Sequence, residues 1–506
     1  MQQLPPRKFT SAAAVLLLAG CTVSPEPITH AEISVQTAGL LERVTLAQEP
    51  VSGPIDLYEA MARALKYNLD HRVEIIDSAL RARELDLAHY SLLPNLVADS
   101  GYAARDNYAA SSSYNILTNT QNFGASTSQE KKISTSDIAF SWNVLDFGLS
   151  YVRARQSADK YLISQENRRK IMQRVIEDVR TAYWRAVSGE RLLTSLRGLE
   201  GRVRRAQATS RAISSERNTS PITAVTYERE LVEIKRTIQE LERDLVVAKS
   251  QLAALMNLRP GTKFSLVTPS NHGKLKIDPT AQDGIATALN NRAELRDIWY
   301  KKRINQHELD AAFLELFPGI NVIAGSNYDS NEFLYNHNWV NWGAKAAWNL
   351  LRVVQYPAKR SVIQAQDDLF DARALALTMA VMTQVHVSRI KFHHFSKELT
   401  TADEYLDVQT RLRELMRAEA AAGRISEQTI IREEMNTVVA KVKRDIMYAN
   451  LQNAYANVYA SMGLDLSISE LPVGGDLRTL ARAIRDVWYE RGDYSAGRPR
   501  VVATVR

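Results

Sequence analysis

Two segments of the chain alternate hydrophobic and polar residues with a period of two, as in strands whose faces meet different surroundings. The mainly apolar face carries Ser136, Ile138, Phe140, Trp142 and Val144 in the first segment, and Val340, Trp342, Ala344, Ala346, Trp348 and Leu350 in the second. The opposite face carries Thr135, Asp137, Ser141 and Asn143 in the first segment, and Asn341, Gly343, Lys345 and Asn349 in the second. The pattern predicts strands at about 133–146 and 339–351.

A partner strand is expected before each of these, directly after a proline. The segment after Pro318, about 319–329, alternates with Ile320, Val322, Ala324 and Tyr328 on one face. The segment after Pro94, about 95–105, shows the pattern only weakly. Residues 106–132 are rich in Ser, Asn and Thr and predict a loop, and 330–338 predict a shorter one.

Proline is absent between Pro94 and Pro221 and between Pro357 and Pro472, and these stretches cover most of the chain that follows each strand pair. They are rich in Ala, Leu, Arg, Glu and Gln, which favour helix. The sequence predicts helical hairpins at 149–257 and 355–462, with turns at Asn218-Thr219-Ser220 and Ala422-Gly423-Arg424. Gly423 is expected to end one helix and Ser426 to cap the next. Helices of roughly 100 Å suit antiparallel coiled-coil packing.

The chain contains an internal repeat. Trp142-Asn143-Val144-Leu145 recurs as Trp348-Asn349-Leu350-Leu351, and Met256-Asn257-Leu258 recurs at the same offset as Met462-Gly463-Leu464. Upstream, a second and larger offset relates Ala64-Leu65 to Ala288-Leu289 and Pro94 to Pro318. These pairs predict a duplicated strand–strand–helix–helix unit at 55–258 and 280–464. A linker at 259–279 joins the two units, and an extension at 465–506 follows, with a helix at Leu477–Arg491.

The single cysteine stands directly after a signal-like segment. Arg7 and Lys8 precede an apolar run that ends at Gly20, which is typical of a secretory signal peptide at 1–20. Leu18-Ala19-Gly20-Cys21 resembles the lipobox of bacterial lipoproteins, which implies acylation of Cys21 and an N-terminal segment 21–54 that is anchored in lipid. Thr22, rather than Asp, favours the outer membrane within that family. The alternative is an ordinary signal peptide with a chance cysteine.

Four amphipathic strands in one chain leave two open sheet edges, which lipid does not tolerate. Two copies would supply eight strands and three copies twelve, and a twelve-stranded barrel has room for a lumen. Because the polar faces of the strands need contact with water, the twelve-stranded barrel is favoured over the eight-stranded one. The alternative is a half-buried sheet in a soluble protein.

With these features the chain resembles the TolC-like outer-membrane efflux proteins. The features that carry the resemblance are the duplicated unit, the Trp-Asn-x-Leu strand ends, the Gly423-x-x-Ser426 turn and the Met-x-Leu segments. The resemblance implies a mainly α fold with membrane β structure, in which a homotrimer forms a twelve-stranded barrel that continues as a long periplasmic α-helical barrel. It also implies docking to a periplasmic adaptor, or membrane fusion protein, and to an inner-membrane pump.

The resemblance further implies which residues form the periplasmic entrance and contact the adaptor. They are Arg217, Asn218, Thr219, Ser220, Gly423, Arg424, Ser426, Thr429 and Arg432. Some family members carry aspartate rings where Thr429 and Arg432 stand, so an acidic ring is not expected here. Glu427, Glu433 and Glu434 lie nearby and are interpreted as a solvated helix face. The barrel residues expected to face lipid are Phe140, Trp142, Trp342 and Trp348.

The positive charge is concentrated in one predicted helix. The whole chain has 64 Lys and Arg and 57 Asp and Glu, a net charge of +7, whereas residues 153–217 alone carry +9. Five arginines stand near the predicted tip: Arg202, Arg204, Arg205, Arg211 and Arg217. One reading is an electropositive entrance that favours anionic cargo or an acidic adaptor. The other reading is a solvated outer face.

Motifs for catalysis, nucleotide binding or metal ligation are absent from the sequence. The prediction is therefore a protein that is not an enzyme and holds no cofactor or metal, with no nucleic-acid partner. The leading function is a passive outer-membrane export channel for small-molecule efflux. The alternatives are a duct for secreted protein or polysaccharide, and a non-conducting periplasmic adaptor or scaffold.

Overall fold

The computed structural model describes residues 26–44, 48–215, 221–267, 275, 277, 280–464 and 475–492. The chain divides into two compact units, Met1–Pro50 and Val51–Arg506. In the first unit, α2 (His30–Arg43) begins with a capping box: the Glu32 amide donates to the Thr29 hydroxyl, and the Thr29 amide donates to the Glu32 carboxylate at 2.8 Å. The predicted signal segment and Cys21 lie outside the described residues.

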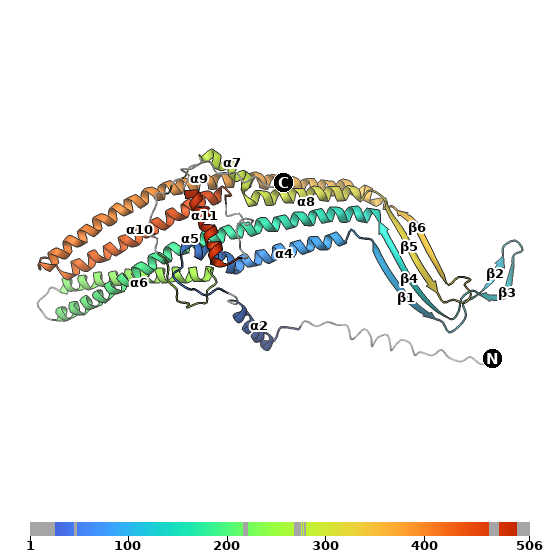
Figure 1. The fold of residues 1–506 in the computed structure, drawn as a ribbon, viewed down its shortest axis with the longest axis horizontal. Helices are drawn as coiled ribbons and strands as arrows, with labels where there is room; N and C mark the ends of the chain where they lie inside the picture. The colour runs from blue at the N-terminus through green and yellow to red at the C-terminus, as the bar shows by residue number, and fades with distance from the viewer. Residues whose placement is uncertain are drawn as a thin grey trace. The chain divides into compact units, whose positions relative to one another are not determined.

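The second unit passes twice through the same order of elements (Figure 1). The first series is α3 (Leu57–Tyr67), α4 (Leu69–Tyr90), β1 (Asn95–Ala104), β4 (Lys132–Asn143), α5 (Val144–Ser215) and α6 (Pro221–Leu255). The second series is α7 (Ala281–Asn291), α8 (Ala293–Leu314), β5 (Gly319–Asp329), β6 (Asn338–Ala347), α9 (Leu351–Ala421) and α10 (Glu427–Ser461). A hairpin of β2 (Ala110–Asn115) and β3 (Thr120–Thr127) interrupts the first series, and α11 (Leu477–Gly492) follows the second.

Each series begins with a helix pair, which the predicted strand–strand–helix–helix unit lacked. Asp56 caps α3 and Thr280 caps α7, at the same offset that relates Pro94 to Pro318. Asn68 and Arg292, again at this offset, separate the two helices of each pair with nearly equal backbone angles. Of the first pair, α4 lacks a clear amphipathic signal because it exposes its large apolar residues and buries His71 and Ser78.

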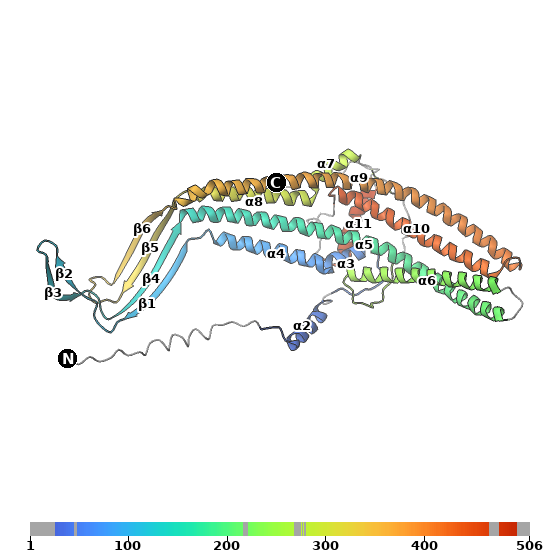
Figure 2. The same cartoon turned by 180° about the vertical axis from the view of Figure 1, so that it is seen from behind.

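The strands form an antiparallel sheet in the order β1-β4-β5-β6, with β1 and β6 at its edges. Because the two repeats contribute adjacent strand pairs, β4 and β5 join them at the centre, and Phe140 lies opposite Ala324. The sheet leads into the helices α5 and α9, and the helix tips lie at the far end of the unit (Figures 1 and 2).

The junctions between β4 and α5 and between β6 and α9 both lie earlier in the chain than predicted. β4 ends at Asn143 and β6 at Ala347, so that residues 144–146 and Leu351 are helical. The physical reason is a side-chain cap at each junction. The Asn143 Oδ1 accepts from the Leu145 amide at 3.0 Å, and the Asn349 Oδ1 accepts from the Leu351 amide at 3.2 Å. These asparagines are equivalent in the two repeats and end the strand pattern in the same way.

The segment predicted as a loop at 106–132 contains the β2–β3 hairpin. Its strands are exposed on both faces, so they show no alternation between apolar and polar residues. The second repeat holds the base of the hairpin through buried Asn331. The Asn331 Oδ1 accepts from the Glu130 amide at 3.1 Å, and its Nδ2 donates to the Ser128 carbonyl at 2.9 Å.

The long helices are stabilised by burial along their length. The 72 residues of α5 extend about 108 Å, and its neighbours change from α4 and α8 to α6 and α10. Val179, Ala186, Leu196 and Val203, which are spread along the helix, are fully buried. Gly189 permits the closest approach to α6, because a Cβ there would lie 3.0 Å from the Leu245 Cβ. None of the described helices is long and apolar enough to cross a membrane.

The C-terminal helix α11 lies where the sequence predicted a helix, and it packs against α3 and completes the central hydrophobic core. Leu480 and Ile484 are fully buried there, and Trp488 lies under the Arg180 guanidinium at 4.3 Å from the ring centre. The core also takes in residues from α3, α5 and α10.

Candidate functional site

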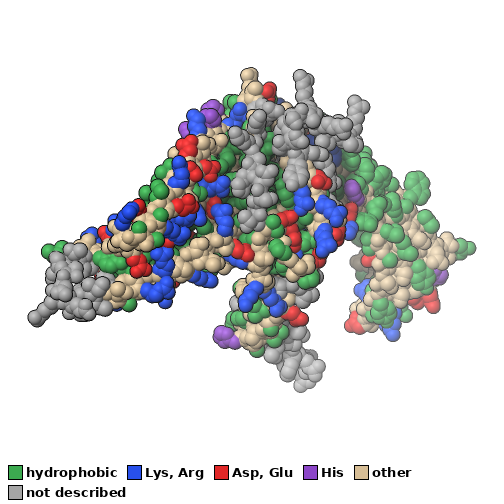
Figure 3. All heavy atoms as spheres, turned by 60° about the vertical axis from the view of Figure 1, so that its left-hand side comes forward, with side chains coloured by type: hydrophobic (Ala, Val, Ile, Leu, Met, Phe, Trp, Pro, Cys, Tyr) green, Lys and Arg blue, Asp and Glu red, His purple; other side chains and the backbone are tan. Residues whose placement is uncertain are grey.

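One face of the four-stranded sheet is apolar and open, as the alternating pattern predicted. Leu96, Phe140, Ala324 and Trp342 lie opposite one another in a row across all four strands. Trp342 is 86% exposed, and Trp142 packs edge-on against Phe147 at 5.6 Å. Hydrophobic side chains gather over the sheet, whereas the helices mix acidic and basic side chains (Figure 3). The chain by itself covers little of this apolar face.

The opposite face of the sheet is polar and carries a pair of carboxylates. Asp99 of β1 lies directly opposite Asp137 of β4, and the row continues with Asn327 of β5 and Trp339 of β6. The Asn327 amide, oriented to satisfy its neighbours, donates to the Asp137 Oδ1 at 3.1 Å. Carboxylates that lie opposite each other across strands repel unless water screens them. This face is therefore suited to water.

Trp348 lies just beyond β6 rather than within it. Its indole Nε1 donates to the Leu316 carbonyl at 2.9 Å, at the turn that ends α8. The exposed indole therefore joins the end of α8 to the start of α9. The strand position assigned to Trp348 by the sequence pattern was wrong, because the Asn349 cap draws the following residues into the helix.

The turn between α9 and α10 has the predicted form. Gly423 has a φ of +71°, and its amide donates to the Ala420 carbonyl at 2.9 Å, while the Arg424 amide donates to the Glu419 carbonyl at 3.0 Å. Ser426 caps α10 by accepting from the Thr429 amide at 3.3 Å. The corresponding residues of the first repeat, Arg217, Asn218, Thr219 and Ser220, lie outside the described residues.

Side chains near the tips link the two helical hairpins. Glu230 of α6 accepts from Arg432 and, at 3.0 Å, from Gln428, both of α10. Glu434 of α10 lies between Arg202 of α5 and Arg417 of α9. Glu433 and Glu434 are buried, so their interpretation as a solvated face was wrong. No local pattern in the sequence marks these links, because the partners belong to helices that are far apart along the chain.

The basic residues near the tip are largely paired with acidic ones. Besides Arg202, Arg204 pairs with Glu200 at 2.8 Å and Arg211 pairs with Glu228 at 2.6 Å. Arg205 is exposed. The pairing lowers the local positive field and favours the solvated-face reading of the basic helix over an electropositive entrance.

Two helices expose apolar stripes that have no partner within the described chain. On α4 the stripe lies opposite the buried face and consists of Leu69, Val73, Ile76, Leu80, Leu87 and Tyr90. On α9 most of the exposed large apolar residues fall along one side of the helix, and these include Val354, Val362, Leu369, Met379, Ile390, Tyr405, Val408, Leu412 and Leu415. Only six of the 71 residues of α9 are buried. Stripes of this kind mark helix–helix interfaces.

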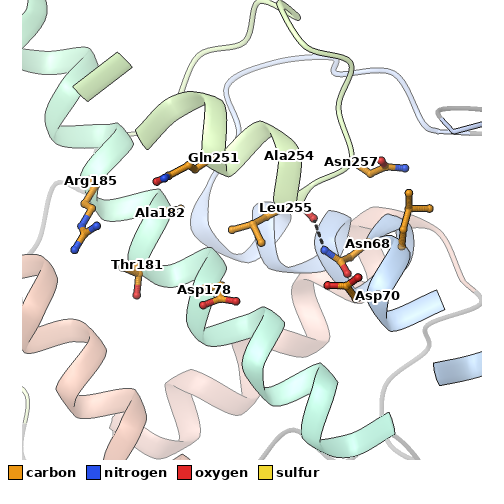
Figure 4. A pocket seen from close by; sticks show the side chains of 11 residues that line it. Asn68, Asp70, Asp178, Thr181, Ala182, Arg185, Gln251, Ala254, Leu255 and Asn257 are labelled. Carbon is orange, nitrogen blue, oxygen red and sulfur yellow. Dashed lines mark hydrogen bonds between the residues drawn. The ribbon is translucent and has the colours of Figure 1, made fainter. Parts of the chain in front are cut away.

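A groove of about 530 Å³ lies where the start of α4 and the end of α6 meet the middle of α5 (Figure 4). Its polar lining includes Asn68, Asp70, Asp178 and Arg185. The Asn68 Nδ2 donates to the Leu255 carbonyl at 3.3 Å. Partial burial raises the pKa of the Asp178 carboxyl, which Arg174 opposes. Within the described part of the chain, no three His, Cys, Asp or Glu residues are placed to hold a metal ion.

No protein-family profile and no curated protein matches the sequence. Solved structures do match the fold. The CmeC outer-membrane channel of Campylobacter jejuni is 12% identical, with a TM-score of 0.65, over 89% of this chain and 94% of that one. The MtrE outer-membrane channel of Neisseria gonorrhoeae, in its open state, is 14% identical, with a TM-score of 0.61, over 88% and 98%. CusC, described by its transmembrane channel formation, is 15% identical, with a TM-score of 0.62, over 83% and 96%.

The chain has the fold of the TolC-like outer-membrane channels. This confirms the resemblance seen in the sequence at the level of the fold, through high coverage of both chains despite low identity. Four strands of the described chain form this sheet. Its edge strands, β1 and β6, each have one side that no other described strand pairs with.

Proposed function

We propose that the chain forms a passive export channel of the outer membrane as a homotrimer. The observation that carries the proposal is a sheet with one apolar open face, one polar face and two unpaired edges. The apolar face with its tryptophans suits lipid, and the polar face suits a water-filled lumen. The solved structures that share the fold are outer-membrane channels, which favours the same role here.

Closure of the sheet sets the number of copies. Unpaired strand edges are costly in lipid because no water can satisfy the backbone groups. The internal repeat indicates how the unpaired edges are closed between copies, because β4 of the first repeat pairs with β5 of the second repeat within one chain. By the same rule, β6 of one copy pairs with β1 of the next. Three copies give a twelve-stranded barrel with space for a lumen.

The helices follow the same rule. The α4 stripe of one copy meets the α9 stripe of its neighbour, as α8 meets α5 within the chain. The three helical parts then continue the barrel as a periplasmic tube. Acylated Cys21 anchors the N-terminus in the outer membrane. A periplasmic adaptor and an inner-membrane pump deliver small molecules to the tips, where Gly423, Arg424 and Thr429 lie on the entrance side.

Disulfide cross-linking between copies tests this arrangement. The repeat rule places Ala346 of one copy opposite Ser100 of the next, just as Phe140 lies opposite Ala324 within the chain. A variant with Ser100→Cys and Ala346→Cys should yield covalent trimers in outer-membrane fractions under oxidation. Ser100→Cys with Val340→Cys is the control, because the shift along the strand separates the sites by about 20 Å. Monomers alone, or equal cross-linking of both variants, would refute the closure.

A further inference from the structure

The groove in the first repeat has a filled counterpart in the second repeat. Arg292 is the equivalent of Asn68 in the second repeat, and its guanidinium occupies the corresponding junction of α8, α9 and α10. Arg292 is only 7% exposed there. It donates to Glu294 twice at 3.0 Å, to the Gln384 Oε1 at 3.0 Å and to the Ala460 carbonyl at 3.2 Å. The second repeat therefore shows which chemistry this junction binds.

The acceptors of that guanidinium are kept in the first repeat. Asp70 corresponds to Glu294, Asp178 to Gln384, and the Ala254 carbonyl to that of Ala460. All three lie around the groove (Figure 4). The Gln-to-Asp change makes the set more acidic than the one that holds Arg292. The carbonyls at the end of α6 also favour a cation, because a helix C-terminus carries partial negative charge.

The first repeat has no positively charged residue at the position that Arg292 occupies in the second repeat. Asn68 replaces the arginine, and its short side chain donates to the Leu255 carbonyl and caps α4 by accepting from the His71 amide. Arg174 stands 3.7 Å from Asp70, and both of these side chains are largely exposed. Arg185 also lines the groove, and its equivalent in the second repeat, Lys391, is likewise a cation, so the repeat that holds Arg292 carries a positive residue at the same sequence position.

We propose that this groove is a binding site for a guanidinium group that does not come from the first repeat itself. Asp70 and Asp178 would share its charge, and the carbonyls that end α6 would accept its remaining N–H groups. The group is supplied either by a free small molecule or by an arginine of a second copy of the chain. The site is independent of the proposed export role, because it is read from the repeat alone.

Carboxylate footprinting tests the site. In the purified full-length protein, carbodiimide coupling of glycine ethyl ester to Asp178 is followed by mass spectrometry with arginine amide present. At a concentration of about twice the Kd, mass action gives about threefold slower labelling. Citrulline amide, the neutral isostere, should give no protection. Equal protection by both compounds, or by neither in any assembly state, would overturn the proposal.

Two variants separate site chemistry from folding. Asn68→Arg should fill the groove from within, so that Asp178 labels slowly without ligand and arginine amide adds nothing. Asp178→Asn should weaken the protection of Asp70 because the guanidinium loses one of its two carboxylates, whereas Asp283→Asn, remote from the groove in α7, should leave the protection unchanged. Protection in both dissociated and assembled protein indicates a free ligand. Protection in dissociated protein alone indicates an arginine of a neighbouring copy.

Discussion

At the residue scale, both repeats end their second long helix with a residue in the left-handed backbone conformation. Asn257 has a φ of +56° after α6, and its equivalent in the second repeat, Gly463, has a φ of +69° after α10. A Cβ on Gly463 would lie 2.8 Å from the Asn291 backbone carbon, whereas Gly423 faces open space. Gly463 and Gly423 share the left-handed backbone conformation but differ in how closely other atoms approach them. They therefore form a matched pair for comparing the same substitution.

Alanine at Gly463 should destabilise the fold more than alanine at Gly423. Both substitutions place a Cβ in the left-handed region, which costs about 1 kcal/mol. Only Gly463→Ala also forces two backbone segments apart, which should add about 1–3 kcal/mol. Chemical unfolding of the two variants measures the difference. Equal losses of unfolding free energy in the two variants would mean that the backbone at the end of α7 moves away from the new Cβ at no cost in free energy.

A buried histidine gives the fold a dependence on pH. His71 is 1% exposed, its Nδ1 contacts the Leu65 carbonyl at 2.8 Å, and its Nε2 has no hydrogen-bond partner within the described chain. Burial lowers the pKa of His71, and Arg168 of α5 lowers it further. Folding therefore favours the neutral ring, and this stability is lost as the pH falls below about 6.5, the ordinary histidine pKa.

Unfolding free energy should therefore fall between pH 7.5 and 5.5 by at most about 1.4 kcal/mol per pH unit for this group. His71→Leu, which copies Leu295 of the second repeat, should flatten that slope in chemical unfolding experiments. His89→Leu, at an exposed position of the same helix, is the control and should leave the slope unchanged. An unchanged slope in His71→Leu would assign the pH dependence to other groups.

At the element scale, ion pairs join helices that are distant in sequence. Glu434 is buried and bound by arginines of α5 and α9, so three long helices meet at one carboxylate. Glu230 is half-buried and joins α6 to α10 through an arginine that is itself exposed. Because the Glu434 carboxylate is buried while its arginines are partly exposed, removing its charge should cost more than losing an exposed ion pair, which is worth about 0–1 kcal/mol.

Glu434→Gln should therefore lower the unfolding free energy by about 1–3 kcal/mol, because two arginines lose their charged partner. Glu230→Gln should cost no more than about 1 kcal/mol. If the links also hold the tips together, both variants should raise the conductance of the channel in planar bilayers. Asp403→Asn, which breaks an α9–α10 pair away from the tip, serves as the control. Conductance unchanged in all three variants would exclude the links as a restraint on the entrance.

The sequence predicted the elements whose signal is local and missed those fixed by distant contacts. Period-two alternation and the Gly423-x-x-Ser426 turn placed the strands and one helical turn to within a few residues. The hairpin β2–β3 was missed because both of its faces are exposed, and Asn331 holds it from the second repeat. The groove could have been found by aligning Asn68 with Arg292, but its acceptors depend on the packing of three helices.

At the scale of the whole molecule, the repeat predicts two kinds of seam between helices. Within the chain, α5 and α8 meet through charged pairs: Asp159 with Arg303, Glu166 with Arg296, and Lys170 with Asp297. The corresponding positions on α9 and α4 are Ala365 and Ala79, Ala372 and Arg72, and Ala376 and Val73. The seam proposed between copies therefore lacks these ion pairs and is formed by the two exposed stripes.

An aspartate in the α4 stripe should disrupt assembly where one beside the stripe does not. Leu80→Asp places a charge in the proposed interface, which costs several kcal/mol when it is buried without a partner. Arg81→Asp introduces the same side chain one residue along, about 100° around the helix, and is the control. Sedimentation in detergent should show the Leu80 variant dissociated and the control assembled. Because the proposed seam lacks the equivalents of the three ion pairs between α5 and α8, assembly of the unaltered chain should persist in high salt, whereas salt-induced dissociation would place charged contacts between the copies.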